Sequence, residues 1–348
     1  MKLVVGFINY NESTAKYLPY FLPSLKKALD FAFGHYEAAD SYKVIAFDNS
    51  DNENNENSAY IKENFPDFTS VYSGKNLGFA GAYNLIIARA VKFKAEYFLM
   101  INPDTILAED SILKMIELLD FNKKLGAVAP RILKWDFSSL QKTDFIDSDG
   151  ITMAFNHHAF DSNQGLSRIG LPEINSFIFG FTGAAALIRV TALEDVAFNI
   201  FGRLEYLDEL MFMYKEDIDL SYRLQLAAWP IMLCPKAIIY HDRSASSLGR
   251  GLRQIINNRK NKSRRVREWS FLNQWIIVCR YLSLPWSLAI KFKILFHQLV
   301  ASFFVMIFEP GLLRQLFLLI SYCKEIKLKS CQLKLKIDLS EIEKILIK

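Results

Sequence analysis

Residues 97–105 read Tyr-Phe-Leu-Met-Ile-Asn-Pro-Asp-Thr, and this stretch indicates the fold class. Five apolar residues in succession predict a strand that is buried on both faces, as in parallel sheets covered by helices. Asn102 ends the run and Asp104 follows two residues later. The stretch therefore predicts a buried strand that places a carboxylate at the edge of a sheet.

Residues 1–130 repeat this pattern, because short apolar runs alternate with helix-like segments. The expected strands are 3–8, 43–48, 69–72, 97–102 and 127–130, and the expected helices are 17–32, 58–64, 80–93 and 111–121. Such alternation predicts an α/β fold with a parallel sheet, in which ligands bind at the carboxyl ends of the strands. Polar residues follow these strands, so we expect a ligand site there. Beyond residue 130 the sequence predicts strands at 183–190 and 237–241 and a helix at 216–228.

The composition of the 348-residue chain excludes several classes of protein. With 51% hydrophobic residues the chain is not intrinsically disordered, and at roughly 150 residues per domain its length predicts two domains. Four scattered cysteines without a CxxC pair exclude a disulfide framework and favour a reducing, cytosolic compartment. The N-terminal apolar run is too short for a signal peptide and predicts a first buried strand.

The net charge of +5 is distributed unevenly. Residues 1–242 carry 22 Lys/Arg and 31 Asp/Glu, whereas residues 243–348 carry 20 Lys/Arg and 6 Asp/Glu. Opposite charges predict different partners for the two segments. We therefore expect a first domain at residues 1–247 and a basic, helical region at residues 248–348.

The C-terminal region combines a basic run with apolar segments. Eight cations and no acid lie between Arg250 and Arg267, and apolar, aromatic-rich segments follow at 269–279, 281–290, 294–308 and 315–323. None of these uncharged runs reaches the ~20 residues needed to cross a bilayer, so we expect helices that lie in the interface of an anionic membrane. A basic helical subdomain packed on the first domain is the alternative.

Three carboxylates are candidates for chemistry. Asp104 could hold a hard cation that neutralises a diphosphate, although Pro followed by Asp is also common in turns. Glu216 and Asp217 could cap a helix, yet they follow an aromatic stretch that would raise a carboxyl pKa and suit a general base. His241 ends a predicted strand and could supply a nitrogen ligand to the cation at Asp104, although a single histidine is more often structural.

Two glycine-containing segments are candidates for ligand binding. Residues 76–84 read Asn-Leu-Gly-Phe-Ala-Gly-Ala-Tyr-Asn and open a helix, where free N–H groups suit anionic or nucleotide ligands. The chain has no GxGxxG fingerprint and no GxxxxGK[ST] loop. The main sequence evidence for a dinucleotide-dependent oxidoreductase or a P-loop protein is therefore missing. Gly183 permits close backbone approach or starts a strand.

In order and spacing, these segments resemble the inverting glycosyltransferases of family 2, and especially the rhamnosyltransferase-like branch that acts on bacterial surface polysaccharides. The resemblance covers residues 3–247 and rests on Asp48-Asn49, residues 76–81 with Asn84, residues 102–105, Gly183, residues 207–209, residues 212–220 with Arg223, and His241.

The resemblance implies a GT-A fold, with a mostly parallel, mixed sheet flanked by helices, that binds a nucleotide-diphospho-sugar. It also implies roles for individual residues. Asp217 would be the catalytic base, with Glu216 binding the acceptor or positioning the base, and Asp104 and His241 would hold Mn²⁺ or Mg²⁺. The residues that would bind the nucleotide-sugar are Tyr10, Asn11, Asp48, Asn76, Gly78, Asn84, Asn102 and Gly183.

We therefore expect a metal-dependent, inverting hexosyltransferase at the cytoplasmic face of the membrane. The donor would be a UDP- or dTDP-sugar, with dTDP-rhamnose a leading candidate, and the acceptor a glycan linked to polyprenyl diphosphate in O-antigen or capsule synthesis. A non-catalytic membrane scaffold that retains a sugar-nucleotide fold is the alternative. The acidic first domain and the apolar C-terminal region argue against nucleic acid as a partner, and the short uncharged runs argue against a processive synthase with a membrane channel.

Overall fold

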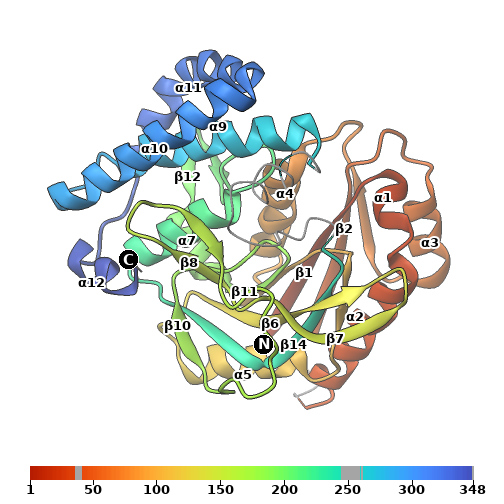
Figure 1. Cartoon of the computed structure of the whole chain (residues 1–348). Helices are drawn as coiled ribbons and strands as arrows, with labels where there is room; N and C mark the ends of the chain where they lie inside the picture. Colours follow the sequence, from red (N-terminus) through yellow and green to blue (C-terminus); the bar gives the residue numbers. More distant parts are fainter. Residues whose placement is uncertain (36–40, 244–258, 260–261, 347–348) are drawn as a thin grey trace.

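The computed structural model describes residues 1–35, 41–243, 259 and 262–346. A ten-stranded mixed sheet lies at its centre, with helices on both faces (Figure 1). The strands are β1 (Lys2–Asn9), β2 (Ser41–Asp48), β3 (Thr69–Tyr72), β4 (Tyr97–Ile101), β5 (Thr105–Leu107), β6 (Ala127–Asp136), β7 (Gln141–Ser148), β8 (Ile151–Met153), β9 (Ala159–Asp161), β10 (Ser176–Ile178), β11 (Ala185–Arg189), β12 (Phe198–Ile200), β13 (Arg203–Glu205) and β14 (Ile231–His241). The helices are α1 (Asn11–Ala15), α2 (Leu18–Phe33), α3 (Glu56–Asn64), α4 (Gly78–Lys92), α5 (Ser111–Phe121), α6 (Val190–Val196), α7 (Glu216–Leu226), α9 (Arg264–Tyr281), α10 (Leu288–Phe308), the 3₁₀ turn η1 (Pro310–Arg314), α11 (Gln315–Ser330) and α12 (Leu339–Ile345).

The alternation predicted for residues 1–130 is confirmed, and β3 and α5 have the predicted bounds. Strands β4, β1, β2 and β3 lie side by side in this order and pair in parallel. Strand β11 lies antiparallel between β4 and β6, which makes the sheet mixed. The sequence did not predict β5, whose three residues pair antiparallel with β14.

Two hydrophobic cores hold the helices on the sheet. On one face, Leu22 of α2 and Met115 of α5 are fully buried in one core cluster. On the other face, Ile86 of α4 and Leu224 of α7 are fully buried in a second cluster. The sheet is therefore covered on both sides, which explains why β4 is apolar along its whole length.

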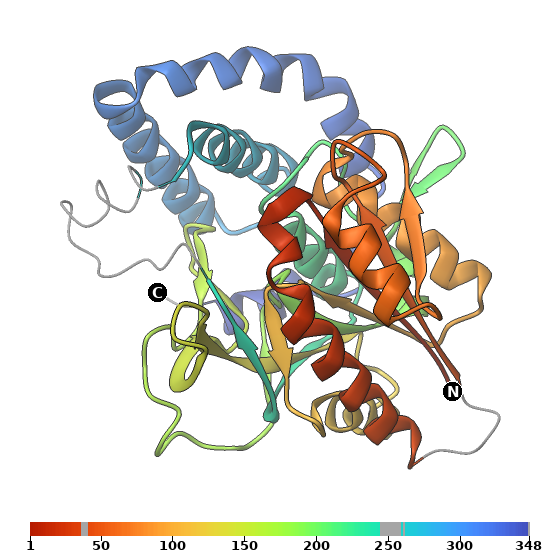
Figure 2. The same cartoon turned by 90° about the vertical axis from the view of Figure 1, so that its right-hand side faces the viewer.

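A third core joins the C-terminal helices to α7. The rings of Tyr222 on α7 and Tyr281 on α9 stack with their centroids 4.1 Å apart. Helices α9, α10 and α11 lie on the side of the molecule toward which β1 and β2 end (Figures 1 and 2). The domain boundary expected at residues 247–248 lies outside the described residues.

Helix α10 extends beyond the apolar run seen in the sequence of the C-terminal region. Among the described residues, it is long and apolar enough to cross a membrane by length and composition, with 21 residues and a mean hydropathy of 1.6 over an 18-residue window. The uncharged run is shorter because Lys291 and Lys293 interrupt it, but the helix begins before these lysines at Leu288. The prediction that no uncharged run reaches ~20 residues therefore holds, while the helix as a whole is longer than this run.

Candidate active site

A cavity of about 870 Å³ opens at the carboxyl edge of β1, β2 and β4. It contains four of the residues predicted for the donor and metal sites, which are Tyr10, Asn76, Asn102 and Asp104. This volume lies in the range of small-molecule sites in proteins. The position agrees with the rule that parallel sheets bind ligands at the carboxyl ends of their strands.

Asp104 and His241 meet because of strand register. Asp104 lies in the turn between β4 and β5, and the next residue, Thr105, pairs with His241 at the end of β14. His241 Nε2 therefore lies 3.3 Å from Asp104 Oδ2, and its Nδ1 lies 2.9 Å from Oδ2 of Asp147 on β7. Burial alone would lower the pKa of His241, but the two carboxylates raise this pKa to about 10.

The donor set at Asp104 fits a divalent cation. Asp104 Oδ1 is buried and has no hydrogen-bond partner among the described residues. Asp147 accepts a hydrogen bond from Nδ1 of His241, an arrangement common around protein-bound metals. A cation at Asp104 would displace the Nε2 proton, and Nε2 would then be the ligating atom. Carboxylate oxygen with imidazole nitrogen is a donor set suited to transition metals such as Mn²⁺.

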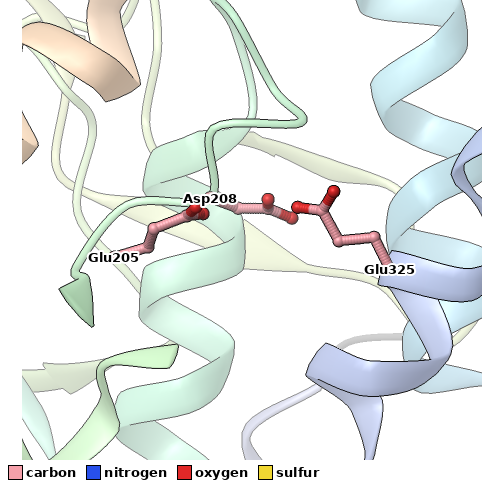
Figure 3. Close-up of side chains that lie close together, drawn as sticks. All are labelled: Glu205, Asp208 and Glu325. Carbon is pink, nitrogen blue, oxygen red and sulfur yellow. The ribbon is translucent and has the colours of Figure 1, made fainter. Parts of the chain in front are cut away.

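Figure 3 shows a second acidic cluster, formed by the side chains of Glu205, Asp208 and Glu325. Lys329 Nζ lies 2.8 Å from a Glu205 oxygen, 2.6 Å from Asp208 and 2.7 Å from Glu325. The lysine is fully buried, and its ammonium group supplies the charge that the carboxylates require. This cluster is therefore an internal ion network.

Asp217 lies in the first turn of α7, where the backbone fixes its carboxylate. Oδ2 accepts a hydrogen bond of 2.8 Å from Gly183 N, and Oδ1 accepts one of 2.8 Å from Ile218 N. Burial raises the pKa of Asp217, and these two N–H groups oppose the increase. A raised carboxyl pKa brings the group closer to the range that favours general-base catalysis.

The chain is strained immediately before Asp217. Tyr214 has a φ angle of 73° and Lys215 one of 71°, although neither is glycine. Left-handed conformations at such residues cost free energy and concentrate at functional sites. Lys215 leads directly into α7, where Asp217 accepts a hydrogen bond from Gly183 N.

Glu216 lies deeper than its neighbour Asp217. It is 4% exposed, and its Oε2 atom has no hydrogen-bond partner within the described structure. Burial, followed by the nearby charge of Asp217, raises the pKa of Glu216 well above the usual range. Glu216 therefore favours the neutral form.

Three of the residues predicted to contact the nucleotide hold loops at the carboxyl edge. Asn11 donates from Nδ2 to Asp51 Oδ2 over 3.0 Å, which ties α1 to the loop after β2. Asp48 accepts hydrogen bonds from Ser50 N and from Asn55 Nδ2, at 2.9 and 2.7 Å, and lines a separate hollow of about 90 Å³. Asn76 Oδ1 accepts a hydrogen bond of 2.8 Å from the amide of the residue two positions later.

Gly78 and Asn84 organise the segment that precedes α7. Gly78 has a φ angle of 70°, and a Cβ atom there would overlap the carbonyl oxygen of Phe212. Asn84 is buried and does not line the cavity. Its Nδ2 donates to Leu207 O over 2.8 Å, and its Oδ1 accepts from Tyr206 N over 2.9 Å. Asn84 therefore holds the backbone of residues 206–207, which directly precede the acidic residues Asp208 and Glu209.

The C-terminal region supplies residues that sequence reasoning missed. Arg265 and Trp269 of α9 line the cavity, and Trp269 packs on Phe212 with ring centroids 5.0 Å apart. The sequence identified this segment as a basic run, but it did not indicate which acids pair with these cations. In the structure, Arg259 and Arg267 both pair with Glu309.

Two solved structures share this architecture. The crystal structure of residues 1–349 of TarS from S. aureus superimposes with a TM-score of 0.50 and 14% sequence identity, over 85% of this chain and 71% of that chain. GalNAc-T7, solved with UDP, GalNAc and Mn²⁺, gives a TM-score of 0.51 and 12% identity, over 84% of this chain and 54% of that chain. The predicted GT-A fold is confirmed.

The sequence matches agree with this fold. The model of Glycosyl transferase family 2 matches residues 5–197, more than half of the chain. The protein therefore belongs to glycosyltransferase family 2. It is also 24% identical over 200 residues to the N-acetylglucosaminyl-diphospho-decaprenol L-rhamnosyltransferase of Mycobacterium tuberculosis, a match that covers 53% of this chain and 62% of the relative.

Proposed function

We propose that the protein is an inverting glycosyltransferase that moves a sugar from a UDP- or dTDP-sugar, with dTDP-rhamnose a leading candidate, to a glycan acceptor. The acceptor is linked to a polyprenyl diphosphate, and the product belongs to a bacterial surface polysaccharide such as O-antigen or capsule. The observation that carries the proposal is Asp217, whose carboxylate is held on the Gly183 loop. The relative named as a rhamnosyltransferase supports the choice of sugar and of lipid carrier.

We assign the donor and the catalytic base to opposite sides of this loop. Gly183 N holds Asp217, and the carbonyl of the next residue, Ala184, accepts a hydrogen bond of 2.9 Å from Asn102 N in the cavity wall. The donor occupies the cavity, and Asp217 removes the proton from the acceptor hydroxyl. The hydroxyl oxygen then attacks the anomeric carbon from the face opposite the diphosphate, which inverts its configuration.

Asp104 and His241 would hold the divalent cation, Mn²⁺ or Mg²⁺. A bound cation stabilises negative charge that develops on the departing diphosphate. The buried, unpartnered Asp104 Oδ1 supports this assignment, as does the Mn²⁺ in the solved structure of GalNAc-T7.

We also propose that the enzyme docks on the cytoplasmic face of an anionic membrane through α10. A stripe of apolar residues on this helix is at least 46% exposed, and it comprises Leu288, Phe292, Leu295, Phe296, Leu299 and Phe303. The opposite stripe, with Ile290 and Ile294, is buried in the core shared with α7 and α9. A helix packed along the protein in this way favours the membrane interface over a transmembrane position.

The variant Asp217→Asn tests the proposed base. We expect turnover to fall by roughly 100- to 10,000-fold while donor binding persists, because the amide cannot accept the proton. The exposed Asp67→Asn variant is the matched control and should retain full activity. If Asp217→Asn keeps more than about a tenth of the wild-type turnover, Asp217 is not the base.

A further inference from the structure

Three basic side chains converge beside Asp217 from different elements. Lys215 precedes α7, His158 lies in the turn between β8 and β9, and His297 lies on α10. The two imidazole rings have centroids 5.5 Å apart. Lys215 Nζ donates a hydrogen bond of 2.8 Å to Oε1 of Gln274 on α9, which fixes the ammonium group at this junction.

We call Lys215, His158 and His297 the basic cluster. Lys215 and His297 are half-buried and His158 is exposed, and among the described residues the cluster differs from the buried basic groups in its lack of acidic ion-pair partners. Buried Arg280 and Lys329 each form ion pairs with carboxylates. In the part of the chain that the structure describes, no carboxylate forms an ion pair with any member of the basic cluster.

The environment of the basic cluster favours an anion. Burial lowers the pKa of Lys215 to about 8 even though Asp217 opposes the effect, and burial together with Lys215 lowers the pKa of His297. Burial, followed by the charges of Lys215 and His297, lowers the pKa of His158 to about 4. Both histidines are therefore neutral near pH 7 without a ligand, and an anion bound beside them would raise their pKa. A bound phosphate would accept hydrogen bonds from the Lys215 ammonium group and from both imidazole rings.

The basic cluster also borders an apolar surface. Phe296, which precedes His297 on α10, is 58% exposed, and Phe292 one turn earlier is 70% exposed. Their rings stack with centroids 6.1 Å apart. A ligand in the basic cluster would therefore have its anionic group near Asp217 and a hydrocarbon chain against α10.

We infer that the basic cluster binds the phosphate or diphosphate group of a lipid-linked acceptor, whose hydrocarbon chain lies on the exposed face of α10. The inference rests on the proposed function and locates its acceptor. Lys215 is two residues from Asp217, so an anchored head group presents its attached sugar to the base.

The test uses the full-length chain and farnesyl diphosphate as a soluble probe, with binding measured by calorimetry. Farnesol and inorganic diphosphate are the comparison probes, because each retains one half of the ligand. We expect the double variant His158→Ala, His297→Ala to bind farnesyl diphosphate at least about tenfold more weakly, through lost charge-assisted hydrogen bonds. The exposed His35→Ala variant is the matched control, and UDP binding to all proteins should be unchanged.

The outcomes separate this inference from the proposed function. If the double variant and wild type bind farnesyl diphosphate equally, or if wild type does not bind it while UDP still binds, the inference is overturned. Inorganic diphosphate that binds as tightly as farnesyl diphosphate would overturn the assignment to a lipid. A folded wild-type protein that binds no nucleotide and transfers no sugar would instead contradict the proposed function.

Discussion

The buried ion network predicts that the C-terminal helices stabilise the catalytic half of the chain. Lys329 of α11 is fully buried and pairs with Glu205 and Asp208, which are 3% and 0% exposed. The variant Lys329→Met keeps most of the side-chain volume but removes the charge. Because both carboxylates then lose a partner inside the protein, we expect the free energy of unfolding to fall by about 3–5 kcal/mol.

Urea unfolding followed by far-ultraviolet circular dichroism measures this change. The control is Lys334→Met, because Lys334 is 47% exposed and pairs with Asp195 at the surface, a contact worth about 0–1 kcal/mol. Adding Glu205→Gln to Lys329→Met should restore part of the loss, since it removes one unpaired charge. If Lys329→Met and Lys334→Met destabilise the protein equally, the network does not stabilise the fold as argued.

The same network has a consequence for truncated chains. Arg280 of α9 pairs with Asp208 and Asp219, and all three side chains are fully buried. A chain that ends at residue 247 would lack both Arg280 and Lys329. Asp208 would then lose both of its cations, and Glu205 and Asp219 would each lose one, so we expect such a chain not to fold.

Three further predictions concern the pH dependence, the donor site and the membrane face. Because burial raises the pKa of Glu216, ionisation opposes folding as the pH rises above the ordinary carboxyl range. The variant Glu216→Gln should therefore be more stable than wild type at pH 8, and the difference should disappear in urea titrations near pH 4. Gly78→Ala should lower the free energy of unfolding by more than about 1 kcal/mol in the same assay and weaken UDP binding, because of its positive φ and the overlap with Phe212. Phe296→Ser should reduce sedimentation with anionic vesicles several-fold, whereas Phe121→Ser, at a site that is 91% exposed on α5, should not.

The periodic part of the fold could be predicted from the sequence because its signals are local. The run at 97–101 is buried between two helical layers, so its apolar character indicates strand β4 directly. Strand β5 has three residues, and its pairing with β14 depends on a partner more than 130 residues away, which periodicity does not report.

In the candidate site, too, the sequence predicted only some of the contacts. The pairing of Asp104 with His241 was expected from the resemblance, whereas Asp147 was missed because nothing local marks it. Arg265 stood in a basic run whose members are indistinguishable in sequence. Tertiary packing places Arg265 in the cavity wall and pairs Arg267 with an acid.

Donor binding and hydrolysis across a panel of UDP- and dTDP-sugars test the central claim most directly. The assay compares Mn²⁺, Mg²⁺ and a chelator, uses full-length protein with added membranes, and includes Asp217→Asn as a control. We predict metal-dependent turnover of one donor that the control binds but does not turn over. A folded protein that binds none of these donors would contradict the assignment as a glycosyltransferase and favour a non-catalytic scaffold.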